Sequence, residues 1–338
     1  MDLNILWFVL IAVLYAGFFF LEGFDFGVGM LLPFVGKKDV ERRAVINTIG
    51  PHWDGNEVWL IVAGGATFAA FPGWYATMFS GFYLGMFLLL VALIFRGVAF
   101  EFRSKIGNPK WRYAWDWAIM ACSFVAPFLL GVVFTNLVKG VPIDGTQMYT
   151  GTFWTLLNPM AILGGLAVAG LFLLHGASFL SLKLTDELHE RTVKISGLAW
   201  VAALVLAGAW FSFLMAGTTT FGNKGFGVVV APFAAVIALI AARWLAGMKR
   251  EGWAFILTGL AIVLSVASLF IALFPNVMIS STASVNNLTI YNASSSAYTL
   301  KVMSIVAAIM VPIVLAYQAW TYWVFRKRIK ADPETLVY

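Results

Sequence analysis

The feature that most constrains this chain is a series of apolar runs, each roughly 20 residues long or longer. A helix of about 20 apolar residues spans the roughly 30 Å hydrocarbon layer of a membrane, where lipid offers backbone groups no other partner. Only 11% of the 338 residues are charged, against about 25% in ordinary soluble domains, which excludes a water-soluble enzyme. Nine runs are predicted to span: 4–32, 52–72, 75–97, 116–137, 157–182, 196–216, 226–246, 253–274 and 299–325.

The positive charges give these runs a direction. Under the nine-span arrangement, 19 of the 22 Lys and Arg residues fall on one side, and Lys139, Lys224 and Lys301 fall on the other. Because such residues are enriched in cytoplasmic loops, we expect the N-terminus outside and the C-terminus in the cytoplasm. The net charge of +6 then reflects topology and contact with membrane lipid, and no nucleic-acid partner is expected. We expect the first run to remain as a helix, since no positive charge precedes it and it is too long for a cleaved signal.

Several acidic residues lie inside two neighbouring runs, where charge is costly. Glu22 and Asp25 lie toward the cytoplasmic end of the first run, and Asp54 and Glu57 lie near the start of the second. A charge in the hydrocarbon layer costs about 2.5–3.5 kcal/mol, so each needs a partner, a proton or water. The spacing of Asp54 and Glu57 places them on one helix face. Arg96 ends the third run on the same side and is placed to balance one charge.

Two interpretations of these acids stay open. In the functional interpretation they form a polar pocket or a proton path that opens to the cytoplasm, because buried acids and a nearby arginine shift one another's proton affinity. In the structural interpretation the acids, Asn56 and Arg96 form a packing network near the lipid headgroups. The functional interpretation is favoured, because three acids on two helices are more than packing needs.

Small residues in the first run indicate how it packs. Gly23 and Gly27 are four residues apart, which is typical of close contact between two membrane helices. A local break in the helix, as transporters use near their substrates, is the alternative.

The three histidines are few for a chain that binds haem or a metal. His175 alone lies inside a run with ligand potential, and a hydrogen-bonded role in the core is favoured over haem ligation. His52 lies at the start of the second run, and His189 lies in a charged loop where we expect it to be solvated. The sequence predicts no metal site in this chain.

Several short motifs form a set that extends from the first run to the C-terminal tail. They are Gly23-Phe24-Asp25-Phe26-Gly27, Pro51-His52-Trp53-Asp54-Gly55-Asn56-Glu57, Phe95-Arg96, Trp115-Asp116-Trp117 and Leu157-Asn158-Pro159. Together they resemble subunit II of the cytochrome bd-type quinol oxidases, and the Trp-Asp-Gly-Asn stretch is the most specific of them.

The resemblance implies an all-α integral membrane protein with nine transmembrane helices. The family arrangement is two four-helix bundles plus one peripheral helix, which would correspond to 1–137, 157–274 and 299–325 within a single membrane domain, 1–338. Complexes of this family oxidise a quinol and reduce dioxygen to water in the bacterial cytoplasmic membrane. Their subunit I holds two b-type haems and haem d, and it forms a heterodimer with a haem-free subunit II.

The resemblance also implies roles for particular residues. Asp25 and Asp54 match family positions thought to conduct protons, with Arg96 beside them, and Trp59 lies where the family places an aromatic residue near the subunit boundary. The resemblance leaves open whether a small single-helix subunit joins the complex.

Our mechanism hypothesis is that Asp25 and Asp54 accept cytoplasmic protons and relay them toward the oxygen-reducing haem of the partner. Glu57 and Glu22 lie on the same path, and Arg96 tunes their charge. A proton-coupled secondary transporter is the alternative from another class, and a purely structural subunit is the third.

Overall fold

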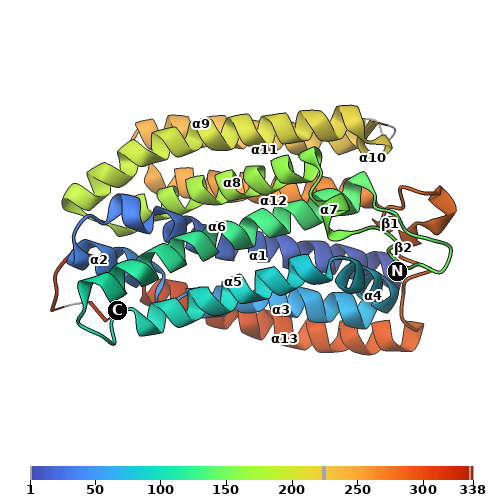
Figure 1. The fold of residues 1–338 in the computed structure, drawn as a ribbon, viewed down its shortest axis with the longest axis horizontal. Helices are drawn as coiled ribbons and strands as arrows, with labels where there is room; N and C mark the ends of the chain where they lie inside the picture. Colours follow the sequence, from blue (N-terminus) through green and yellow to red (C-terminus); the bar gives the residue numbers. More distant parts are fainter. Residues whose placement is uncertain (1, 223–225, 335, 338) are drawn as a thin grey trace.

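The structure is a computed structural model that describes residues 2–222, 226–334, 336 and 337. Its long helices lie side by side along one axis, and α1 (Leu3–Val35) runs through the middle of the bundle (Figure 1). The other elements are α2 (Asp39–Ile49), α3 (Trp53–Ala70), α4 (Pro72–Gly81), α5 (Tyr83–Phe102), α6 (Pro109–Lys139), α7 (Phe153–Leu156), α8 (Pro159–Lys183), α9 (Asp186–Gly217), α10 (Thr219–Gly222), α11 (Phe226–Gly247), α12 (Glu251–Leu273), β1 (Asn276–Met278), a 3₁₀ turn (Ser284–Asn286), β2 (Leu288–Thr289) and α13 (Ala297–Val324).

Eight helices in the described part of the chain are long and apolar enough to cross a membrane: α1, α5, α6, α8, α9, α11, α12 and α13. The prediction of a multi-pass, all-helical membrane protein is therefore confirmed, whereas the count of nine spans is not reached by length and composition. The predicted run 52–72 corresponds to α3. Its opening turns carry Asp54, Asn56 and Glu57, which lower its apolar content.

The predicted third run, 75–97, is divided between α4 and α5, with Phe82 between the two helices. A search for apolar stretches does not find this boundary, because the residues on both sides of it are apolar. The same search misses α2, whose charged residues lower its average apolarity. All residues of 44–49 in α2 are nevertheless buried, so the second half of this short helix lies inside the bundle.

Gly27 lets α1 approach α8 at backbone distance. A Cβ atom at Gly27 would lie 2.0 Å from the carbonyl oxygen of Phe172 and 2.7 Å from the Cα of Gly176. At Gly23 an added Cβ would lie 3.0 Å from the ring of Phe172. The close packing predicted from this glycine pair is confirmed. Because α1 is continuous through both glycines, the alternative of a helix break is wrong.

We expect Gly27→Val to destabilise the folded subunit. Overpacking costs about 1–3 kcal/mol, and the upper end applies here because the obstructing atoms are backbone atoms that cannot rotate away. Thermal unfolding of the detergent-solubilised complex measures the effect. The matched control is Gly208→Val in α9, where an added Cβ meets no atom within 4 Å in the described structure. Equal losses of stability in the two variants would contradict the prediction.

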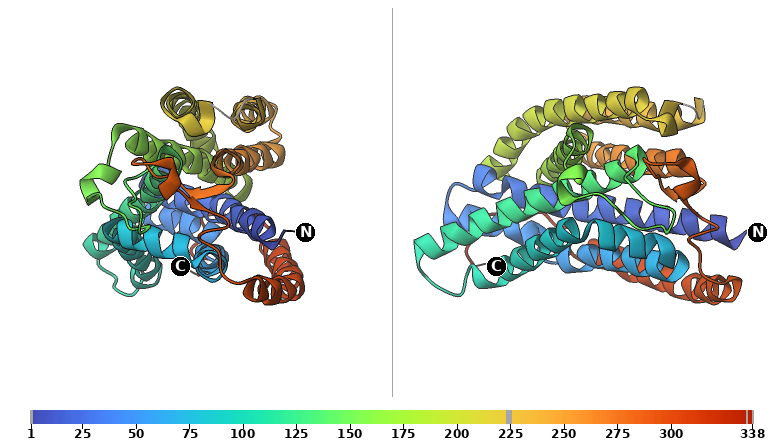
Figure 2. Two further views of the ribbon diagram at one scale, coloured as in Figure 1. Left: turned by 90° about the vertical axis from the view of Figure 1, so that its right-hand side faces the viewer. Right: turned by 45° about the vertical axis from the view of Figure 1, so that its right-hand side comes forward.

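α13 lies along the edge of the bundle and is largely exposed (Figure 2). Near its start, the Nε1 of Trp7 donates hydrogen bonds to the carbonyl oxygen of Leu300 and to the Oγ of Ser304, both at 3.0 Å. Near its other end, Lys183 donates to the carbonyl oxygens of Phe325 and Lys327, the latter at 2.9 Å. Polar contacts therefore attach α13 at both ends, while its middle presents an apolar surface.

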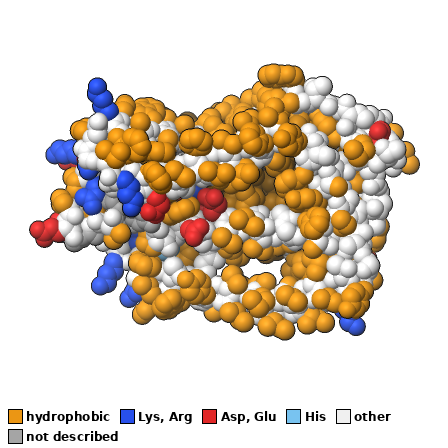
Figure 3. Space-filling view, turned by 60° about the horizontal axis from the view of Figure 1, so that its bottom comes forward, with side chains coloured by type: hydrophobic (Ala, Val, Ile, Leu, Met, Phe, Trp, Pro, Cys, Tyr) orange, Lys and Arg blue, Asp and Glu red, His pale blue; other side chains and the backbone are white. Residues whose placement is uncertain are grey.

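The two ends of the bundle differ in charge. Lys and Arg side chains gather at one end of the face seen in Figure 3, and apolar side chains cover much of the rest of that face. At the opposite end, where the N-terminus lies, β1 and β2 pair in an antiparallel hairpin, and Leu288 of β2 and Ile290, which follows it, are fully buried. Lys224, one of the three lysines that the sequence places on the sparse side, lies outside the described residues.

Candidate functional site

Polar side chains of α1 and α3 meet inside the bundle. The Nδ2 of Asn56 donates a hydrogen bond to the Oδ2 of Asp25 at 2.6 Å, and a longer one to the carbonyl oxygen of Leu21 at 3.4 Å. Glu22 and Asp25 both have 0% exposure. The spacing of these two acids places them on one side of α1. The sequence predicts that acids of these two helices lie at a similar depth, and in the structure a polar residue of α3 does contact an acid of α1.

Arg96 of α5 supplies the positive charge of this site. Its guanidinium pairs with Glu22 and, at 3.1 Å, with the Oε2 of Glu57. The guanidinium carbon also lies 4.5 Å from the ring centroid of Phe26 and 5.3 Å from that of Phe100. Stacking on aromatic rings and charge-assisted hydrogen bonds hold this planar group in one orientation. We use the name acid cluster for Glu22, Asp25, Asn56, Glu57 and Arg96.

The charges of the acid cluster do not balance. With all three carboxyl groups and the guanidinium ionised, the cluster would carry a net charge of −2 in the interior of the bundle. Buried charge without a partner costs free energy. Carboxyl groups that share a site therefore tend to bind protons, because protonation removes the repulsion between their negative charges. Glu22 and Asp25 lie one helical turn apart and interact electrostatically. The acid cluster therefore has the composition of a site that holds and exchanges protons.

Four buried atoms of the acid cluster have no hydrogen-bond partner among the described residues. They are the Oε2 of Glu22, the Oδ1 of Asp25, and the Nε and Nη2 of Arg96. Nearly all buried polar groups bond to protein or to ordered water. Since two of these atoms accept and two donate, water can satisfy all four, whereas a cation would satisfy only the acceptors. The described residues also include no group of three His, Cys, Asp or Glu side chains that could hold a metal.

Asp54 is the predicted site residue that the structure leaves outside the acid cluster. Its side chain is exposed, and the described part of the chain gives it no hydrogen bond or ion pair. It still lies close enough to Glu57 to interact with it electrostatically. Glu57 itself is partly exposed, with 20% of its side chain accessible. Exposure therefore falls in order from Asp54 through Glu57 to Asp25.

Gln318 and Tyr322 of α13 complete the site, and the sequence analysis missed both. The Nε2 of Gln318 and the Oη of Tyr322 donate hydrogen bonds to the Oδ1 of Asn56, at 3.0 and 2.9 Å. The Nε1 of Trp59 donates to the Oε1 of Gln318 at 2.9 Å, so Trp59 lies beside the site. The available signal was the spacing of two polar residues, four apart, in an otherwise apolar helix.

A second, partly buried network of charges joins α2, the C-terminal end of α5 and α6. Asp116 pairs with Arg103 at 2.5 Å and with Arg42 at 2.9 Å, and Asp39 pairs with Arg103 at 2.8 Å and with Arg112 at 2.7 Å. Burial raises the pKa of Asp39, but the two guanidinium groups outweigh it and hold that pKa below its ordinary value. The stabilisation from Asp39 is therefore present above its ordinary pKa and is lost as the pH falls. This network serves to hold three helices together.

The three histidines have different surroundings. Both ring nitrogens of His175 are engaged, by the Oγ1 of Thr258 at 2.8 Å and the carbonyl oxygen of Phe20 at 3.1 Å, so the predicted core role is confirmed. The prediction that His189 is solvated holds in part, since 27% of its side chain is exposed while its Nε2 lies 2.5 Å from the Oε1 of Glu251. His52 is buried and stacks on the ring of Tyr322, with the two centroids 4.4 Å apart.

These surroundings test whether the chain suits a haem. Haem iron needs an axial His, Met, Cys or Tyr side chain that faces an open pocket. The buried histidine inside a span, His175, has both nitrogens occupied and stacks on Phe255 at 4.5 Å. His175 therefore does not fit a haem ligand, and the expectation that this chain is free of haem stays a prediction.

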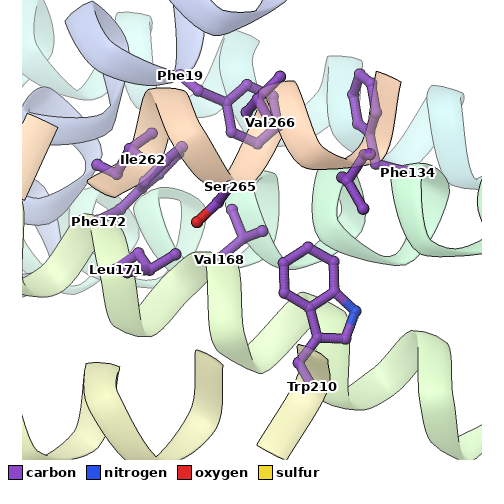
Figure 4. Close-up of a pocket in the computed structure, with 10 residues that line it drawn as sticks. Phe19, Phe134, Val168, Leu171, Phe172, Trp210, Ile262, Ser265 and Val266 are labelled. Carbon is purple, nitrogen blue, oxygen red and sulfur yellow. The ribbon is translucent and has the colours of Figure 1, made fainter. Parts of the chain in front are cut away.

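A small apolar cavity lies in the core between α1, α6, α8, α9 and α12 (Figure 4). The free space for the centre of a water-sized sphere is about 10 Å³. Its two polar neighbours already have partners, since Trp210 donates to Thr135 at 3.0 Å and Ser265 donates to Ala261 at 2.8 Å. Apolar cavities of this kind stay dry, so the acid cluster is the candidate site.

The chain is similar to proteins of one family over almost all of its length. A family model described as cytochrome bd terminal oxidase subunit II matches residues 3–325. Cytochrome bd ubiquinol oxidase subunit 2 of Bacillus subtilis (strain 168) is 46% identical over 341 residues, which cover 100% of this chain and 99% of the relative. Cytochrome bd-I ubiquinol oxidase subunit 2 of Escherichia coli (strain K12) is 40% identical over 366 residues, covering 98% and 97%.

A solved structure shows the same fold. A chain of the bd oxidase from Geobacillus thermodenitrificans superposes with a TM-score of 0.74 and covers 96% of this chain and 99% of that one. At 18% sequence identity this likeness supports the arrangement of helices alone.

Proposed function

Because the chain belongs to the family of cytochrome bd terminal oxidase subunit II, we propose that it delivers cytoplasmic protons to the oxygen-reducing site of its complex through the acid cluster. The chain is a subunit of a terminal respiratory oxidase, a quinol:oxygen oxidoreductase in a bacterial membrane. Membership of this family does not favour the proton-coupled transporter alternative.

The observation that supports the proposal most directly is the fully buried carboxyl group of Asp25, which lies beside other acids and beside buried polar atoms that have no protein partner among the described residues. Asp25 accepts a hydrogen bond through one oxygen, while its other oxygen has no partner in the described structure. A packing network has no need of four unsatisfied atoms, because each of them costs free energy. A chain of water molecules through these atoms accounts for them and conducts protons.

The proposed path follows the gradient of exposure. Exposed Asp54 attracts protons at the surface, and partly exposed Glu57 passes them inward. Glu22 and Asp25 hold protons in the interior, where Arg96 fixes their position and balances part of their charge. We place the basic end of the bundle, with the C-terminus, in the cytoplasm, since Lys and Arg gather there. Protons then enter from the inside.

The haems of the complex belong, in this proposal, to a partner subunit I that oxidises the quinol. We place α3 and Trp59 near the boundary with that partner, because α3 exposes Ile61 and Phe68 along the part of the helix that follows its polar first turns. In this proposal α3 also crosses the membrane and, with the eight helices counted above, brings the number of spans to nine. Residues 1–137 and 157–274 form two four-helix bundles, and 299–325 forms the peripheral helix. A small single-helix subunit stays an open expectation.

Replacing Asp54 by Asn tests the entrance of the path. We expect quinol oxidation by the purified complex to slow by less than about tenfold, because an exposed carboxylate acts by concentrating protons near the surface. The slowing should shrink at high ionic strength. The absorption spectrum of the haems should stay normal, which separates a proton defect from an assembly defect. Unchanged turnover at low ionic strength would remove Asp54 from the path.

A purely structural subunit remains the competing function. It predicts that substitutions in the acid cluster change haem content or assembly and leave the turnover per haem unchanged. Turnover normalised to haem therefore distinguishes the two.

A further inference from the structure

The acid cluster is joined to α13 by hydrogen bonds whose direction is fixed by chemistry. The indole Nε1 of Trp59 can only donate, and it donates to Gln318 at 2.9 Å. Gln318 must therefore present its Oε1 to Trp59, which leaves its Nε2 to donate to Asn56 at 3.0 Å. Asn56 accepts with Oδ1 and so donates with Nδ2 to Asp25 at 2.6 Å. The donor role of the Trp59 indole therefore fixes the direction of each hydrogen bond in the series that ends at the carboxyl group of Asp25.

Two further contacts favour the same orientation of Asn56. The Oη of Tyr322 donates to its Oδ1 at 2.9 Å, and the carbonyl oxygen of Leu21 faces its Nδ2 at 3.4 Å. A flipped amide would set Nδ2 against the Nε2 of Gln318, which can only donate, and Oδ1 against two acceptors, so these three contacts would be lost and only the hydroxyl of Tyr322 could turn to accept. Asn56 is only 1% exposed, which leaves no bulk water to replace them.

We propose that Gln318 and Tyr322 are positioning residues that hold the Asn56 amide, keep the Oδ2 of Asp25 as an acceptor, and so direct protonation of Asp25 to its Oδ1. The Oδ1 atom has no hydrogen-bond partner among the described residues, and neither has the Oε2 of Glu22, which lies one helical turn away in α1. A proton therefore passes between Asp25 and Glu22 on the side away from Asn56. This inference rests on the proposed proton path.

Other charged groups also act on Asp25 and have to stay constant in a test. They are Glu22 of its own helix, Glu57 of α3, Arg96 of α5 and the phenol of Tyr322 on α13. Of these groups, neutral substitutions at positions 318 and 322 remove only the phenol. Tyr322→Phe keeps the ring that stacks on His52.

The test is the double variant Gln318→Met with Tyr322→Phe in the intact complex. With both donors gone, the Asn56 amide is free to turn its Oδ1 toward Asp25, which then favours the protonated carboxyl. Infrared spectroscopy follows the protonated-carboxyl band of Asp25 against pH, and the band is identified by its loss in Asp25→Asn. We expect the affinity of Asp25 for a proton to rise by at least about tenfold, the effect of one hydrogen bond to a charged group.

Tyr322→Phe leaves Gln318, which can only donate to Asn56, so it should change that affinity by less than about threefold, well short of one full hydrogen bond. Gln318→Met leaves the Tyr322 hydroxyl, which can also accept, so its shift should lie between those of Tyr322→Phe and the double variant. Ser304→Ala, which removes a contact of α13 with Trp7 far from the site, is the control and should change nothing. If the double variant does not assemble, Trp59→Phe with Tyr322→Phe retains Gln318 and frees it to turn, with the same expected shift.

An unchanged band in the double variant, or equal shifts in the two single variants and the double, would overturn the inference. Normal turnover in Asp25→Asn would instead overturn the proton path. The two failures are therefore distinguishable.

Discussion

Asp25→Asn should lower quinol oxidation by the complex by at least about tenfold, with the haem spectrum and the yield of complex unchanged. Proton transfer by a positioned side chain contributes about 10²–10⁴-fold to catalysed reactions, and water carries part of the flow around a lost carboxyl, so tenfold is the lower bound. Asn fills the same space as Asp and still accepts the hydrogen bond from Asn56 through its carbonyl oxygen. The variant therefore removes the exchangeable proton with little change in packing.

The control for Asp25→Asn is Glu101→Gln, which removes an exposed carboxyl on the same end of α5 as Arg96. That control should retain full turnover. A stopped-flow measurement of proton uptake during a single reaction with dioxygen locates the defect, since the slowed step should be the one that takes up protons. Full turnover in Asp25→Asn, or a loss explained by missing haem, would contradict the proton path.

Much of the acid cluster was predictable because it depends on helix spacing and on the cost of charge in a membrane. The sequence places acidic residues inside two membrane runs: Glu22 and Asp25 in α1, and Glu57 in α3. Each acid needs a partner there, and Arg96 is the cation at a matching depth. All four do meet in the structure. The position of Asp54 was harder to predict. Its spacing from Glu57 places the two acids on one face of α3, but it does not show which of them is more buried.

The contacts of α13 were not predictable in the same way. Asn56 and Gln318 are 262 residues apart, and no local pattern connects them. Their meeting depends on where the last helix lies against the bundle, which is a property of tertiary packing. The division of the predicted run 75–97 into α4 and α5 has a similar cause, since an apolar average does not record where a helix ends.

Arg96→Met should destabilise the subunit by about 3–5 kcal/mol, because it leaves a buried carboxylate without its cation. Glu22 is fully buried and depends on this pairing, whereas Glu57 reaches solvent. Met fills most of the space of the Arg side chain between Phe26 and Phe100, so the loss reflects charge more than volume. Thermal unfolding of the complex, together with its yield, measures the change.

A double variant separates charge from packing in this prediction. Glu22→Gln combined with Arg96→Met removes both charges of the buried pair, and replacing a buried ion pair by neutral groups is close to neutral in free energy. Most of the lost stability should therefore return, and a double-mutant cycle gives the coupling between the two residues. Arg112→Met, at a guanidinium that is 32% exposed, is the comparison and should cost less than about 1 kcal/mol. If the double variant were as unstable as Arg96→Met alone, Arg96 would be held in place for its shape, and the electrostatic account of the acid cluster would be wrong.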